Sequence, residues 1–236
     1  MNTIIGLVII AIGSLGQSSS YVPINKVKNW SWECFWLIQG IFAWLVFPFV
    51  GALLTMPDGL SLFDVYLQES VAVYKSVGYG ILWGIGGLTF GLSMRYLGIA
   101  LGQSLALGTC SAFGTLIPSL LKGQDLFSGE GLVLLTGVSI AIAGIAVIGY
   151  AGALKSSNMS EDEKKKAVKD FALKKGLLIA ILAGVMSACF NLGLEAGAPI
   201  KAHILSLGSE SLLTLNPIIL LVTIGGFVTN ACYCLF

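Results

Sequence analysis

The chain has 236 residues, of which 56% are hydrophobic and 11% are charged, and its mean hydropathy is +0.90. Soluble domains carry about 25% charged residues, so this chain has too little charge to cover a folded surface in water. A soluble enzyme and a disordered chain are therefore excluded. The net charge of +1 gives no reason to expect nucleic acid as a partner. The composition predicts an all-α polytopic membrane protein that lies in a lipid bilayer.

Seven segments are long and apolar enough to be spanning helices, which need about 20 mainly apolar residues. They are expected at 2–22, 34–56, 72–94, 97–121, 131–153, 176–198 and 215–236. The first segment resembles a secretory signal peptide in length. It lacks a basic region at its start and leads into Lys26 without an Ala-x-Ala site, so we interpret it as a retained helix.

The basic residues predict the orientation, because cytoplasmic loops are enriched in Lys and Arg. With the N-terminus outside, the cytoplasmic side holds ten of the 13 basic residues. These ten are Lys26, Lys28, Arg95, Lys155, Lys164, Lys165, Lys166, Lys169, Lys174 and Lys175. We therefore expect a multi-pass protein of the cell (inner) membrane, with the Lys155–Lys175 loop in the cytoplasm.

The same polar loop divides the chain into five expected helices before it and two after it. Residues 1–154 are expected to form a first five-helix repeat, 155–175 a cytoplasmic linker, and 176–236 the start of a second, incomplete repeat. Gly6-Leu7-Val8-Ile9 and Gly176-Leu177-Leu178-Ile179 open helices that enter the membrane from opposite sides, as inverted repeats require. The chain stops at Leu235-Phe236, at the end of an apolar helix, so a C-terminal truncation is expected.

Uncharged polar side chains inside the expected helices are candidates for a substrate site. Such groups cost several kcal/mol if unpaired in hydrocarbon, and they tend to face a cavity or another helix. The candidate substrate-binding residues are Gln17, Tyr79, Trp83, Gln103 and Asn191. Amides, hydroxyls and an aromatic face suit a neutral sugar better than a phosphate or carboxylate. For Gln17, Trp83 and Asn191, hydrogen bonding between helices or anchoring at the interface is an open alternative.

Charged residues near the expected helix ends are candidates for coupling and gating. Glu195 is the only acid clearly inside an expected helix, and it is either the proton-coupling residue or an interfacial carboxylate that reaches water. Glu33 and Arg95 lie near the cytoplasmic side and are a candidate gating pair, with a positive-inside anchor as the alternative for Arg95. His203 is expected in a solvated outer loop.

Other features of the sequence have structural interpretations. The pairs Gly80-x-x-x-Gly84, Gly87-x-x-x-Gly91 and Gly98-x-x-x-Gly102 are typical of closely packed spanning helices. The five cysteines lie in apolar stretches without a Cys-x-x-Cys motif, so neither a metal site nor a cofactor is predicted. The chain shows no nucleophile–base pair and no phosphate loop, which argues against a membrane enzyme.

Three unusual stretches carry a resemblance to a known family. They are the run Lys26-Val27-Lys28-Asn29-Trp30-Ser31-Trp32-Glu33, the run Met94-Arg95-Tyr96-Leu97-Gly98, and the run Leu173-Lys174-Lys175-Gly176-Leu177. In order and spacing the chain resembles the L-rhamnose–proton symporters, a ten-helix branch of the drug/metabolite transporter superfamily. The resemblance implies the first seven helices of a 5+5 inverted-repeat transporter. It also implies proton-coupled uptake of a neutral sugar such as L-rhamnose by alternating access. Another exporter or permease of the superfamily, or a non-transporting truncated membrane subunit, are the alternatives.

Overall fold

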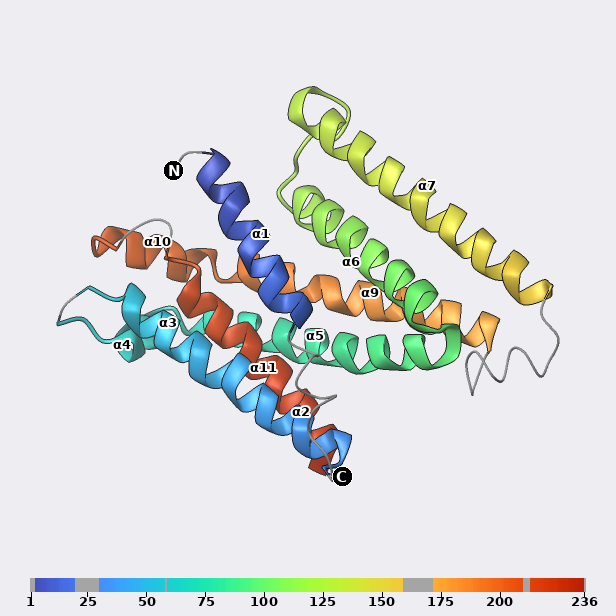
Figure 1. The fold of residues 1–236 in the computed structure, drawn as a ribbon. Coiled ribbons are helices and arrows are strands. Elements are labelled where there is room, and N and C mark those ends of the chain that lie inside the picture. Colours follow the sequence, from blue (N-terminus) through green and yellow to red (C-terminus); the bar gives the residue numbers. More distant parts are fainter. Residues whose placement is uncertain (1–2, 20–29, 58, 159–171, 210–212, 236) are drawn as a thin grey trace.

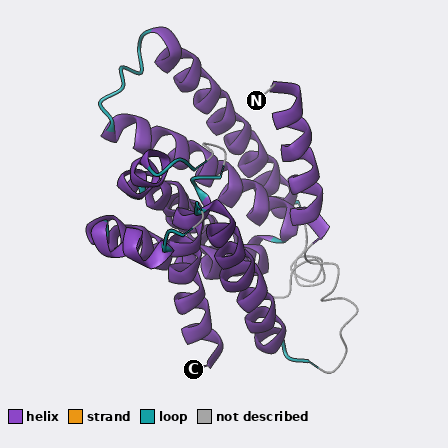
Figure 2. Ribbon diagram, turned by 90° about the vertical axis from the view of Figure 1, so that its left-hand side faces the viewer, coloured by secondary structure: helices purple, strands orange, loops and turns teal. Residues whose placement is uncertain are grey.

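The computed structural model describes residues 3–19, 30–57, 59–158, 172–209 and 213–235. Within them every regular element is a helix (Figure 2), which confirms the prediction of an all-α polytopic membrane protein. Six of the described helices are long and apolar enough to span a membrane: Glu33–Thr55, Ser70–Leu97, Leu101–Leu121, Gly129–Gly152, Leu173–Ser206 and Asn216–Leu235. The apolar segment Ile4–Gly16 is shorter.

The expected helices form within a few residues of their predicted ends. The first is α1 (Thr3–Ser19), and the second is a continuous run of α2 (Trp32–Gly40), the π-helix η2 (Ile41–Val46) and α3 (Phe47–Thr55). The others are α5 (Ser70–Leu97), α6 (Ile99–Leu121), α7 (Gly129–Ser157), α9 (Leu173–Ala196) and α11 (Asn216–Leu235). Most of the predicted linker, residues 159–171, lies outside the described residues, and the division into repeats remains a prediction.

Helix α5 lies at the centre of the bundle. It packs against α9, α11 and α6, and Figure 1 shows α9 running beside it. Helix α6 packs against α9, α7 covers the outer side of α6, and the α2–η2–α3 run packs on α11. We call the end of the bundle where α6 and α9 finish, and where α5 begins, the α10 end.

Glycines allow α5 and α11 to approach closely. A Cβ atom added at Gly80 would overlap the carbonyl oxygen of Val222, and one at Gly84 would lie 2.6 Å from Cβ of Thr229. The first predicted glycine pair is thus confirmed as a packing motif. The second is not in contact, because Cβ atoms added at Gly87 and Gly91 would meet no atom within 4 Å.

The third glycine pair forms the turn between α5 and α6. Gly98 has φ +79°, a left-handed conformation that favours glycine. A Cβ atom added at Gly102 would lie 2.9 Å from the backbone of Met94, so glycine lets the start of α6 approach the end of α5. The sequence interpretation of this pair as a close-approach motif is therefore confirmed at Gly102.

Polar bonds join the α2–η2–α3 run and the short helix α4 (Leu62–Gln68) to α11. The indole Nε1 of Trp36 donates to Oδ1 of Asn230 at 3.0 Å, and Nδ2 of Asn216 donates to Oγ1 of Thr55 at 3.2 Å. The hydroxyl of Tyr66 donates to the carbonyl of Pro217 at 2.7 Å. Burial raises the pKa of the Tyr66 hydroxyl above its usual range. These bonds satisfy polar groups that lipid would leave unpaired.

The helix α10 (Ala198–Ser206) corrects the expectation for His203. This residue does not lie in a solvated loop: its side chain is 19% exposed, and its Nδ1 lies 3.3 Å from Oε1 of Glu69. The reason is that Ile200 and Ile204, four residues apart, are fully buried in a cluster with residues of α4, α5 and α11. Burial of these two side chains holds α10 against the bundle.

Candidate functional site

An open cavity of 810 Å³ lies at the α10 end. Its lining residues are Lys75, Gly78, Tyr79 and Leu82 of α5, Pro118 and Leu121 of α6 with Lys122 at its C-cap, Leu192, Glu195 and Ala196 of α9, and Ala198 of α10. Small-molecule sites in proteins have volumes of about 300–1,000 Å³. The size of this cavity therefore suits a small ligand such as a monosaccharide.

Helical spacing explains how three helices reach this cavity. Side chains four residues apart lie on the same face of a helix. Lys75 and Tyr79 are so related on α5, and Pro118 and Lys122 at the end of α6. On α9, Leu192 and Ala196 are also four residues apart and share one face of the helix. Each helix thus turns one narrow face toward the cavity, while its other faces pack in the bundle or point outward.

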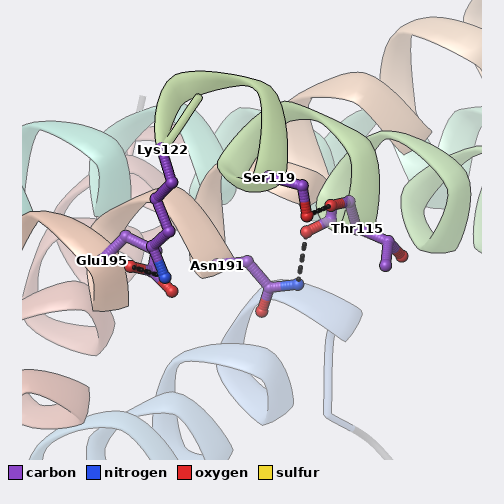
Figure 3. A network of polar contacts seen from close by, with 6 residues as sticks. Thr115, Ser119, Lys122, Asn191 and Glu195 are labelled. Atoms are coloured by element: carbon purple, nitrogen blue, oxygen red, sulfur yellow. Dashed lines mark hydrogen bonds and ion pairs between the residues drawn. The ribbon is translucent and has the colours of Figure 1, made fainter. Parts of the chain in front are cut away.

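An ion pair lies at this cavity and joins α6 to α9. The ammonium Nζ of Lys122 lies 2.7 Å from Oε2 of Glu195, and the two side chains are 61% and 42% exposed. Figure 3 shows the two side chains meeting in front of the helices. Exposed ion pairs contribute only about 0–1 kcal/mol to stability. The pair can therefore break and re-form without unfolding the bundle.

Asn191 lies one turn before Glu195 and makes a bond between helices. Its Nδ2 donates to the carbonyl of Gly114 on α6 at 3.3 Å (Figure 3). A Cβ atom added at Gly114 would lie only 2.9 Å from the same Nδ2, so glycine leaves room for the amide. The structure thus gives Asn191 the interhelical bond that the sequence left as an alternative. The side chain is also exposed, which leaves it accessible to a ligand.

Hydroxyl groups near Asn191 bond within α6. Oγ of Ser119 donates to the carbonyl of Thr115 at 3.0 Å, and Oγ1 of Thr115 donates to the carbonyl of Ser111. Just beyond α6, the carboxylate of Asp125 accepts bonds from the Ser128 hydroxyl and the Phe127 N–H, and these bonds lower the pKa of Asp125. This carboxylate is therefore satisfied within its own turn.

Trp83 lies one turn beyond Tyr79 but does not line the cavity. Its ring packs edge-to-face against Phe190, at 5.1 Å between centroids, and against Trp44, at 5.8 Å. Trp44 in turn packs against Trp36 at 5.5 Å. This aromatic row connects α2 and η2 through α5 to α9. In this structure Trp83 therefore fills the space between helices.

The other candidate residues are not brought to the cavity. Gln103 is exposed on α6, and Gly114 lies about 16 Å further along that helix at 1.5 Å per residue. Glu33 in the first turn of α2 and Arg95 in the last turn of α5 lie at the end opposite the cavity, and both are exposed. Gln17 is in α1, but its side chain lies outside the described residues.

Two lysines of the cavity were not among the candidates from the sequence. In the prediction of orientation, Lys75 and Lys122 are two of the three basic residues that do not lie on the expected cytoplasmic side. Their positions in the sequence nevertheless offered a signal. Lys75 lies four residues before Tyr79, and Lys122 lies four residues after Pro118. This spacing places each lysine on the same helix face as a residue that is expected inside the membrane. In the described residues no three His, Cys, Asp or Glu side chains gather as a metal site would require.

Comparison with known proteins identifies the family. The family model of the L-rhamnose-proton symport protein matches residues 1–236. The chain belongs to this family. It is 34% identical over 235 residues to the L-rhamnose-proton symporters of Yersinia pestis bv. Antiqua (strain Antiqua) and Yersinia pseudotuberculosis serotype O:3 (strain YPIII). These matches cover 98% of this chain and 66% of each relative.

The family resemblance drawn from the sequence is thus confirmed, and so is the prediction that the chain is not an enzyme, because the family is one of membrane transporters. The chain spans about 66% of the length of the curated relatives that it matches. No solved structure matches it.

Proposed function

We propose that this chain takes part in proton-coupled uptake of a neutral sugar such as L-rhamnose across the inner membrane, by alternating access. Family membership supports the reaction class. The observation that carries the proposal for a site is the 810 Å³ cavity, because it brings Tyr79 of α5 together with Glu195 of α9. One supplies an aromatic face and a hydroxyl, and the other supplies a carboxyl that can take up a proton.

The residues have distinct roles in this proposal. Tyr79 and Asn191 bind sugar hydroxyls and the sugar ring, and Glu195 carries the proton. Gln17, Trp83 and Gln103 are proposed to contact the sugar in states in which the path opens toward the other end. Glu33 and Arg95, at that end, are proposed to gate it. Alternating access exposes a single site to each side in turn, so contacts at both ends belong to one cycle.

Transport by the purified chain in proteoliposomes tests the proposal. We expect radiolabelled L-rhamnose to accumulate when the outside is acidic, and a protonophore to abolish the accumulation. Vesicles without protein give the background. Uptake that does not depend on the pH gradient would overturn proton coupling. Uptake no greater than that of vesicles without protein would favour a non-transporting membrane subunit.

The proposed orientation places the N-terminus outside and the Lys155–Lys175 loop in the cytoplasm, because this loop holds seven of the 13 basic residues. A cysteine introduced at Ser157, in a variant without the native cysteines, is expected to resist an impermeant thiol reagent in intact cells. It should react after the cells are made permeable. Rapid labelling in intact cells would reverse the proposed orientation.

Asn191→Ala and Gln17→Ala are each expected to weaken sugar binding by roughly 5- to 150-fold, because losing one hydrogen bond in a desolvated site costs about 1–3 kcal/mol. The measurement is the sugar concentration that half-saturates uptake, with the amount of protein in the membrane determined in parallel. Ser139→Ala is the matched control, since its exposed hydroxyl donates to the Leu135 carbonyl of its own helix, α7, away from the cavity lining. Unchanged affinity in both variants would place the sugar elsewhere.

A further inference from the structure

We propose that Lys122 neutralises the Glu195 carboxylate whenever the proton is absent, so that the empty carrier can change its access without moving an unpaired charge. This inference rests on the proposed function and adds a second residue to its proton site. Lys122 acts on the coupling carboxylate and does not bind the sugar.

The geometry of the ion pair is the first support. Nζ of Lys122 lies 2.7 Å from Oε2 of Glu195, within the distance of a charge-assisted hydrogen bond. Lys122 is at the C-cap of α6 and Glu195 in the last turn of α9, so the bond joins two separate helices. Both residues line the same cavity, which places the pair where the sugar is proposed to bind.

The charges around the cavity are the second support. Besides this pair, the described lining holds Lys75 and Tyr79 from α5, and α10 contributes only Ala198. Glu195 is thus the one carboxylate in the described lining, which also holds two ammonium groups. Of these two, Lys122 is the one that forms an ion pair with it.

The cost of an unpaired charge in hydrocarbon links this geometry to coupling. An intramembrane charge is expensive unless it is paired, and a change of access passes through a state in which the site is closed to water. In the loaded carrier the proton neutralises the carboxyl and releases the Lys122 ammonium, whose side chain is 61% exposed and can turn to water. In the empty carrier the ammonium pairs with the carboxylate. Only these two forms, in which the carboxyl carries no unpaired charge, change access quickly, so sugar moves with a proton.

The proposal predicts different effects on the two halves of the cycle. Exchange of labelled for unlabelled sugar uses only the loaded, protonated carrier, whereas net uptake also needs the empty carrier to return. Lys122→Met should therefore keep exchange and slow net uptake by about tenfold or more, because it removes the ammonium that pairs with the carboxylate of the empty carrier. Lys122→Arg keeps the positive charge and should restore net uptake.

A second substitution separates this role from a structural one. In Lys122→Met/Glu195→Gln neither charge remains, so the empty carrier is neutral again and downhill net uptake should recover, without proton-driven accumulation. A variant that had merely misfolded would not be rescued by a second change. Lys201→Met, at the same end of the bundle but outside the cavity lining, is the control for loss of a lysine.

The experiment measures exchange and net uptake of radiolabelled L-rhamnose in proteoliposomes with each variant. Selective loss of net uptake in Lys122→Met, with rescue by Glu195→Gln, supports the proposal. If the wild-type chain transports while Lys122→Met retains both activities, or loses both and is not rescued, the role of Lys122 is wrong and the proposed function stands. Absence of exchange in the wild-type chain would overturn the proposed function, and this inference with it.

Discussion

Replacing Gly80 with leucine is expected to cost about 3 kcal/mol of stability, at the upper end of what overpacking costs in a well-packed core. The reason is that a Cβ atom at this position overlaps the carbonyl oxygen of Val222, which is backbone and cannot rotate away. The rest of the side chain would force α5 and α11 apart. Because α5 packs against α9 and α6 as well, the whole bundle should unfold more easily.

Gly87→Leu is the matched control for this prediction. It lies two turns further along α5, and a Cβ atom there would meet nothing within 4 Å. Thermal unfolding of the purified variants in the same detergent, followed by tryptophan fluorescence, compares the two. We expect a clear loss of stability for Gly80→Leu and almost none for Gly87→Leu. An equal loss in both would mean that contact with α11 does not set the effect, because leucine has a higher helix propensity than glycine and propensity alone would stabilise both variants.

The spanning helices follow from the sequence because lipid imposes a minimum length of apolar chain. The short helices do not. Helix α10 begins beside Gly197 and Pro199, which are typical of a loop, and only its burial of Ile200 and Ile204 against other helices holds it in place. Likewise α4 has seven residues, too few for a periodic pattern to stand out. Both helices depend on tertiary packing that no local pattern encodes.

The sequence predicts only part of the candidate site, because it does not show which face of each helix points toward the cavity. In lipid, apolar side chains cover both the packed and the lipid-facing sides of a helix, so hydrophobic periodicity does not show which face points inward. Tyr79 and Glu195 lie in the cavity, whereas Trp83, just one turn from Tyr79, packs against Phe190. Glycines are better markers of the packed face, as Gly80 and Gly84 show against α11.

A count of basic residues does not reveal that Lys122 forms an ion pair with another helix. Counting treats each lysine as a loop charge that reports orientation. The structure places this one at 2.7 Å from a carboxylate on another helix. Its partner is 73 positions away in the chain, and no spacing rule within a helix relates residues so far apart. The ion pair is a product of how α6 and α9 pack.

Glu195→Gln is expected to retain exchange of sugar and to lose proton-driven accumulation. The amide keeps nearly the same size and can still form hydrogen bonds, but it cannot ionise. Exchange needs no net movement of protons, whereas accumulation against a gradient does. Since residue 195 then carries no charge whether or not sugar is bound, and the exposed Lys122 ammonium can turn to water, downhill uptake should persist and should no longer respond to the pH gradient.

The comparison needs a control acid from the same end of the bundle. Glu130→Gln serves, because Glu130 is exposed in the first turn of α7 and does not line the cavity. With radiolabelled L-rhamnose in proteoliposomes, Glu130→Gln should accumulate sugar like the wild-type chain, while Glu195→Gln should only equilibrate it. If Glu195→Gln accumulates sugar normally, its carboxylate is an interfacial partner of Lys122 and the proton must bind to another group.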